Sequence, residues 1–140
     1  MTPDSACTAS AIYSGVKTTY GTFGYDSGVE RKVASSIKRS QKVSTIAEWF
    51  QEAGKATGLV TTARVTHATP GALYAQTIER DYECDGEILF DDQESKDIAW
   101  QLVNQEPGRN LKVILGKVIT LRKVFIRDSE DSSLRSNPLV

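Results

Sequence analysis

Two short segments rich in β-branched and apolar residues constrain the fold of this chain more than any other feature. They are "TGLVTTARV" (Thr57–Val65) and "LKVIL" (Leu111–Leu115), and both are typical of β-strands, the second of a buried one. Helical patterns lie before and between them, and the connections are short. This order predicts an α/β fold in which helices flank a mostly parallel sheet. In such folds, functional sites form where strands end and the following helices begin.

Four helical patterns accompany the strands, each with a start signal. They begin at or near Asp4, Thr45, Thr69 and Ser95. The first is expected to end at Gly15, the second opens with a capping box, and the third has proline at its first helical position. The second helix is expected to bury an apolar stripe made of Ile46, Trp49, Phe50 and Ala53.

Composition indicates one globular domain of ordinary size, with 140 residues. A net charge of −1, from 17 basic and 18 acidic residues, gives no support to nucleic-acid binding. No apolar run approaches the roughly 20 residues that span a bilayer, and no targeting signal is recognised at the N-terminus. Cys7 and Cys84 match no zinc spacing, and His67 is the only histidine. A site that needs several imidazoles is therefore excluded for this chain alone.

Ser5 is the first candidate for chemistry, since it lies at the start of the first predicted helix. The unpaired N–H groups and the positive dipole of a helix start favour a phosphate at this place. A plain N-cap serine belongs at the same position. Position alone leaves both interpretations open.

A second candidate segment, Val65–Asp81, contains His67, Thr69 and Arg80. An arginine fork matches a pair of phosphate oxygens, and a threonine hydroxyl is a ligand that magnesium accepts. The alternatives are a helix-capping threonine, a loop histidine, and an arginine paired with Glu79 or Asp81. Spacing alone does not decide between them.

The order of these motifs carries a specific resemblance to a known family. The series "PDSACTASAIYSGVKTTYGTFGYD", "TTARVTHATP", "IERD" and "KDIAWQLVNQEPGRNLKVILG" resembles animal alkaline phosphatases, especially the insect membrane-bound type. It implies that residues 1–116 form part of an alkaline phosphatase domain with an incomplete α/β fold. The tail at residues 117–140 does not match the family, and we expect it to be disordered or a misread product.

The resemblance also implies a reaction, which is hydrolysis of phosphate monoesters through a phosphoserine intermediate. By position, Ser5 resembles the nucleophile and a zinc ligand, and Arg80 the arginine that binds phosphate. Thr69 resembles the threonine whose hydroxyl binds magnesium. His67 resembles a histidine beside that site which does not itself bind the metal. The family uses a pair of zinc ions and a magnesium ion. Its members form homodimers held by a lipid (GPI) anchor at the extracellular face of the plasma membrane.

The chain departs from the family pattern in its metal ligands. The remaining aspartate and histidine ligands that the resemblance implies are absent, and one histidine cannot rebuild a two-zinc site. The positions of a family disulfide also hold other residues, with Ser95 beside one of them. A second hypothesis is therefore a catalytically inactive fragment or pseudoenzyme that at most binds an anion weakly. A third is a chain that does not fold stably, because a sheet cut from a larger protein leaves open edges.

Overall fold

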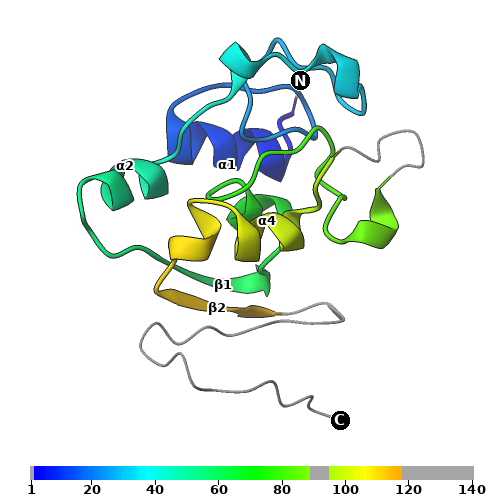
Figure 1. Cartoon of the computed structure of the whole chain (residues 1–140). Helices are drawn as coiled ribbons and strands as arrows, with labels where there is room; N and C mark the ends of the chain where they lie inside the picture. Colours follow the sequence, from blue (N-terminus) through cyan, green and yellow to red (C-terminus); the bar gives the residue numbers. More distant parts are fainter. Residues whose placement is uncertain (1, 89–94, 118–140) are drawn as a thin grey trace.

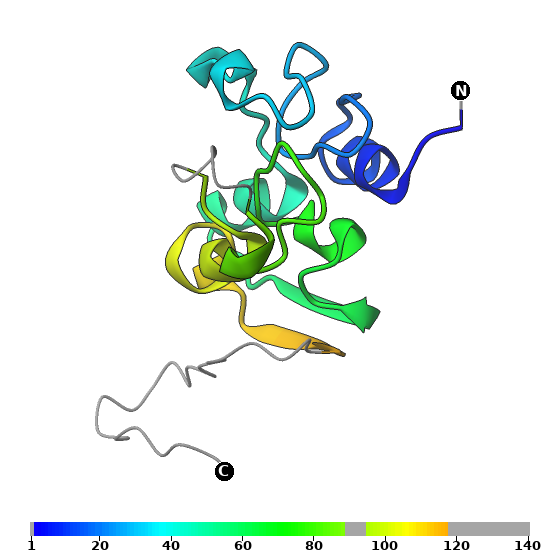
Figure 2. The same cartoon turned by 90° about the vertical axis from the view of Figure 1, so that its right-hand side faces the viewer.

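The computed structural model of the chain describes residues 2–88 and 95–117 (Figure 1). Its larger elements are α1 (Ser5–Ser14), α2 (Ile46–Glu52), β1 (Gly58–Arg64), α3 (Ala68–Gly71), α4 (Ile98–Asn104) and β2 (Val113–Lys117). Short 3₁₀ helices lie between them: η1 (Ala34–Ser36), η2 (Arg39–Gln41), η3 (Asp85–Glu87) and η4 (Gly108–Asn110). Both views place the α-helices on one side of the two strands (Figures 1 and 2).

The sheet consists of β1 and β2, which pair in parallel although a long stretch of chain separates them. Gly58 pairs with Val113 and Val60 with Leu115, and the register shifts before Arg64. Helices α3 and α4 lie in the crossover between the strands. The predicted fold class, a partial α/β fold with a parallel sheet and flanking helices, is therefore confirmed.

The first predicted helix is confirmed together with its end signals. The side chain of Asp4 caps α1 by accepting a hydrogen bond from the N–H of Cys7, at 2.9 Å. Gly15 ends the helix with a φ of +74°, a conformation that glycine adopts without steric penalty. The small side chains of Ala6 and Ala9 are buried, and they let α1 pack closely against α3.

The third and fourth helices begin elsewhere than predicted. α3 starts at Ala68, so Thr69 and Pro70 are its second and third residues and His67 is in the N-cap position. Proline is tolerated there because the first N–H groups of a helix have no intrahelical partner. α4 starts at Ile98 rather than near Ser95, since the side chain of Asp97 caps it by accepting from the N–H of Trp100.

The core lies between the helices and β1. Its buried members are Ala6, Ala9, Phe23, Ala47, Leu59, Val65, Ala68, Ala72, Leu73, Tyr74, Ala75, Ile98 and Leu102. Phe23 comes from the loop after α1, where it forms an antiparallel bridge with Thr77. This bridge joins the loop to the segment that carries Arg80.

Two predictions of burial are wrong for the described residues. In α2 the buried residue is Ala47, whereas Ile46, Trp49 and Phe50 are exposed. All five residues of β2 are exposed, although the segment has the composition of a buried strand. Apolar patterning shows that a face is suited to burial, but the elements that would cover it are not among these residues.

No helix among residues 2–88 and 95–117 has the length and apolarity needed to cross a membrane. Apart from Lys117, the predicted non-matching tail lies outside the described residues. The boundary after Gly116 therefore stays a prediction.

Candidate functional site

The amino end of α1 holds the first candidate residue. Ser5 is half-buried as the first residue of the helix, and Asp4 rather than Ser5 is the N-cap. The interpretation of Ser5 as a capping serine is therefore wrong. The carboxylate of Asp4 caps α1, so the hydroxyl of Ser5 is not needed as a cap.

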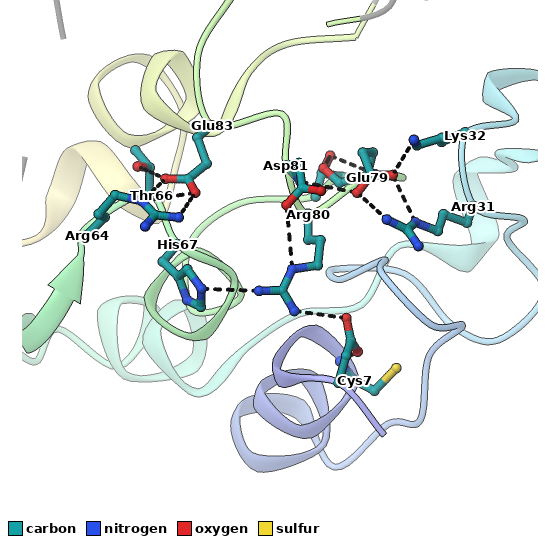
Figure 3. Close-up of polar contacts among 12 residues, drawn as sticks. Cys7, Arg31, Lys32, Arg64, Thr66, His67, Glu79, Arg80, Asp81 and Glu83 are labelled. Atoms are coloured by element: carbon teal, nitrogen blue, oxygen red, sulfur yellow. Dashed lines mark hydrogen bonds and ion pairs between the residues drawn. The ribbon is translucent and has the colours of Figure 1, made fainter. Parts of the chain in front are cut away.

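Arg80 joins the amino end of α1 to the turn that follows β1 (Figure 3). Its Nη1 donates to Oδ2 of Asp4 at 3.2 Å, and its Nη2 lies 3.1 Å from Nε2 of His67. Its Nε is 3.7 Å from Oδ1 of Asp81, a looser contact. The backbone N–H of Arg80 donates to the carbonyl of Gly21 at 2.8 Å. A cationic fork is therefore held beside the helix start where Ser5 lies.

The contact with Arg80 determines the tautomer of His67. A guanidinium only donates, so Nε2 of His67 accepts and the proton is on Nδ1. Nδ1 is buried and has no hydrogen-bond partner among the described residues. Burial, followed by the charges of Arg80 and Arg64, lowers the pKa of His67 and favours this neutral form. The buried Nδ1–H is thus a donor that lacks an acceptor, which suits the oxygen of an anion or of water.

Contacts link three of the four predicted site residues, and none of these contacts involves Thr69. Arg80 contacts His67 and the neighbour of Ser5, so these three lie in one region. Thr69 is exposed on α3, two residues beyond His67. Within the described residues, no hydrogen bond links the hydroxyl of Thr69 to Ser5 or Arg80.

Asp4 also contributes to the electrostatics of this region. Burial alone would raise the pKa of this carboxyl, but hydrogen bonds from Cys7 and Arg80 outweigh it, so the pKa is lowered. Asp4 is therefore an anion that balances the charge of Arg80. Sequence reasoning missed this role, although the position of Asp4 directly before Ser5 was a usable signal.

Glu79, which precedes Arg80, is buried and pairs with other residues, so the predicted surface ion pair between Glu79 and Arg80 is wrong. The carboxylate of Glu79 is buried and accepts two hydrogen bonds from Arg31, each 2.8 Å long. Lys32 lies 3.3 Å from the same carboxylate. Burial tends to raise the pKa of Glu79, but the bonds from Arg31 and others outweigh it and the pKa is lowered.

Glu83 is a second buried carboxylate that sequence reasoning missed. It pairs with Arg64, at the end of β1, and accepts a 2.6 Å hydrogen bond from the hydroxyl of Thr66. This network fixes the turn that leads from β1 to His67 (Figure 3). Burial tends to raise the pKa of Glu83, but the bonds from Arg64 and Thr66 outweigh it and the pKa is lowered.

The lowered pKa of Glu83 predicts a loss of stability in acid. The stabilising effect of this carboxylate is fully present above its ordinary pKa of 4.5, and it is lost as the pH falls through the lower folded-state value. Glu83→Gln should therefore reduce the free energy of unfolding at neutral pH and flatten its decline below about pH 5. Urea unfolding at a series of pH values measures both effects. Glu52→Gln, at an exposed glutamate, is the control and should leave the free energy of unfolding at neutral pH nearly unchanged.

The family model for alkaline phosphatase matches residues 1–135. This chain belongs to the alkaline phosphatase family. It is 48% identical over 115 residues to alkaline phosphatase 4 of Drosophila melanogaster, covering 81% of this chain and 19% of that protein. It is 49% identical over 116 residues to the tissue-nonspecific alkaline phosphatase of Gallus gallus, covering 81% and 22%.

The membrane-bound alkaline phosphatase of Bombyx mori is 40% identical over 118 residues, again covering 81% of this chain and 22% of the relative. Among solved structures, a variant of the TAB5 alkaline phosphatase with Mg bound in its M3 site matches with a TM-score of 0.54 and 25% identity. That match covers 80% of this chain and 25% of the solved one. The predicted resemblance to animal alkaline phosphatases is confirmed. The chain spans about a fifth of the length of these curated relatives.

Proposed function

We propose that this chain carries the nucleophile and the phosphate-binding arginine of an enzyme that hydrolyses phosphate monoesters. The observation that carries the proposal is the position of Arg80, which Asp4 holds beside the amino end of α1. Membership of the alkaline phosphatase family supports it.

The guanidinium of Arg80 retains donors for a phosphate. Each terminal nitrogen carries a second N–H group beyond the one directed at Asp4 or at His67. A planar guanidinium with a free donor on each terminal nitrogen can bind a pair of phosphate oxygens. The N–H groups and the dipole at the start of α1 would attract the same anion.

Ser5 is the proposed nucleophile. Its hydroxyl oxygen would form a bond to phosphorus while the bond from phosphorus to the ester oxygen breaks, which gives a phosphoserine and releases an alcohol. Water would then attack the same phosphorus, release inorganic phosphate and restore the hydroxyl of Ser5. Arg80 would hold the phosphoryl oxygens through both steps, and its positive charge would balance the negative charge on them.

The proposal includes zinc and magnesium, but this chain would supply only some of their ligands. Ser5 would supply one oxygen to zinc and Thr69 one oxygen to magnesium, with His67 nearby. A zinc site needs three or four protein ligands, and residues 2–88 and 95–117 contain no group of three or more His, Cys, Asp or Glu that could hold a metal. The described residues therefore do not fit a complete zinc or magnesium site. In addition, Nε2 of His67 accepts from Arg80, which puts the proton on Nδ1, so neither nitrogen is free to bind a cation.

The proposal also covers the membrane association and the oligomeric state of the complete protein. The named membrane-bound relative supports association with a membrane. By resemblance, the complete protein would be a homodimer with a lipid anchor at the extracellular face of the plasma membrane. These properties belong to the whole protein rather than to the described residues.

A second candidate function is weak anion binding without catalysis, and the incomplete metal site favours it for the 140-residue chain by itself. We expect this chain, supplied with zinc and magnesium, to show little or no turnover of a chromogenic phosphate ester at alkaline pH. Calorimetric titration with inorganic phosphate should still detect binding. Robust turnover by the chain alone would show that the ligand argument is wrong.

Hydrolysis itself is best tested in a chimera. Residues 2–117 would replace the matching fifth of the Drosophila melanogaster relative, and the ester assay would be repeated. Ser5→Ala should lower kcat by at least about a thousandfold, because the attacking atom is lost. The affinity for inorganic phosphate should change little, since Arg80 remains.

Ser35→Ala makes the same chemical change at an exposed serine of η1 and should leave kcat unchanged. A folded chimera that shows no turnover, or one that keeps its turnover after Ser5→Ala, would contradict the proposed function.

A further inference from the structure

The backbone around Arg80 forms a turn that is braced by the side chain of its own neighbour, Glu79. Oε1 of Glu79 accepts a hydrogen bond from the N–H of Asp81 at 3.2 Å. This bond links the residue before Arg80 to the residue after it. The hydroxyl of Thr77 donates to the carbonyl of Glu79 at 2.9 Å and accepts from its N–H at 3.2 Å. The conformation of this turn therefore depends on where the carboxylate of Glu79 is held.

Arg31 holds that carboxylate from a distant part of the chain. Its Nε and Nη2 each donate to a different oxygen of Glu79, both at 2.8 Å, in the bidentate geometry that fixes the orientation of both groups. Its guanidinium carbon also lies 5.3 Å from the centre of the Tyr20 ring. Only 1% of the surface of Glu79 is exposed, so it cannot exchange these partners for water.

The loop that carries Arg31 also contacts the backbone of the turn. The N–H of Arg80 donates to the carbonyl of Gly21, and the N–H of Lys32 donates to the carbonyl of Ile78. Gly21 has a φ of +79°, and a Cβ on it would lie 2.4 Å from Nε of Arg31. The close approach of Arg31 therefore requires glycine here, and the loop and the turn are built as one unit.

In this ion pair Glu79 is buried while the side chain of Arg31 is 32% exposed. Desolvation of the buried carboxylate offsets part of the attraction, so the pair is a poor source of stability. It does restrict geometry, and the part restricted here is the turn that directs the guanidinium of Arg80 toward Asp4 and His67 (Figure 3). We propose that Glu79, clamped by Arg31, is a positioning residue that presents Arg80 to a phosphate at the start of α1. This inference rests on the proposed phosphate-binding role of Arg80.

The test uses the full 140-residue chain with ¹⁵N-labelled arginine. The Nε–H signal of Arg80, identified by its loss in Arg80→Lys, reports whether its guanidinium is held. Calorimetric titration with inorganic phosphate reports binding. Arg31→Met keeps most of the side-chain stem and removes the fork, Arg31→Lys keeps the charge, and Arg109→Met is the control at an exposed ion pair with Glu106.

In Arg31→Met, we expect the Arg80 Nε–H to exchange with water as fast as in free arginine and phosphate binding to weaken about tenfold. Arg31→Lys should restore part of both properties, and Arg109→Met should change neither. If Arg31→Met does not fold, Glu79→Gln takes its place, because it keeps the shape and an oxygen for the N–H of Asp81. It should give the same effects in smaller degree.

If the Arg31–Glu79 pair has only a structural role, Arg31→Met should lower the melting temperature but leave the Arg80 signal and the phosphate affinity of the folded variant unchanged. That result would overturn the inference. It would also be overturned if the parent signal already resembled free arginine, or if the signal changed while phosphate bound as before. If the parent chain binds no phosphate but its Arg80 signal still depends on Arg31, the proposed phosphate-binding role of Arg80 is contradicted. The part of the inference that says the Arg31–Glu79 pair positions Arg80 is then supported.

Discussion

Replacing Arg80 with alanine is expected to weaken the binding of inorganic phosphate by at least about a hundredfold. Arg80→Ala removes two charge-assisted hydrogen bonds, each of which contributes about 1.5–3 kcal/mol. It also leaves the carboxylate of Asp4 without its cationic partner beside the anion, so repulsion adds to the loss. Calorimetric titration of the full chain with phosphate measures the change.

One further variant separates charge from geometry at this position, and a second is a control at another arginine. Arg80→Lys keeps the charge but lacks the planar fork, so an intermediate affinity is expected. Arg64→Ala removes another ion-paired arginine, whose guanidinium is engaged by Glu83, and it should change phosphate affinity far less. An Arg80→Ala chain that binds phosphate as the parent does would contradict the proposed role.

The residues nearest to the proposed chemistry could be predicted from the sequence, while the groups that hold them could not. Ser5 and Arg80 lie within motifs whose order resembles the family, and the structure places Arg80 at the helix start. Their assigned roles stay predictions. The Arg31–Glu79 pair joins residues 48 positions apart, and no local pattern encodes such a pair.

The same division between local and distant information applies to the fold. α1 begins directly after its N-cap Asp4 and ends directly before its C-cap Gly15, so both ends depend on neighbouring residues and lie within a residue of where they were predicted. The capping box of Thr45 and Glu48 is likewise present at α2. Burial depends on elements that are distant in the sequence, and here the apolar pattern predicted the wrong residues. The described part of the chain corresponds to about a fifth of its curated relatives, so a face suited to burial can lack a cover.

The difference between predicted and observed burial can be measured at two phenylalanines, Phe23 and Phe50. The side chain of Phe23 is fully buried, with 0% exposed, and its tip lies where a Cβ on Gly71 would be only 3.1 Å away. Phe50 has the same side chain on α2, but 49% of it is exposed. The sequence pattern predicted burial for Phe50 and assigned no such role to Phe23.

Phe23→Ala should lower the free energy of unfolding by about 3–5 kcal/mol, because it removes buried apolar surface and leaves a cavity in tight packing. Phe50→Ala deletes the same atoms from a half-exposed site and should lower it by less than about 1 kcal/mol. Urea unfolding of both variants and the parent, followed by circular dichroism, compares them directly. Equal losses would mean that α2 is covered in the folded chain and that the core described around Phe23 is wrong.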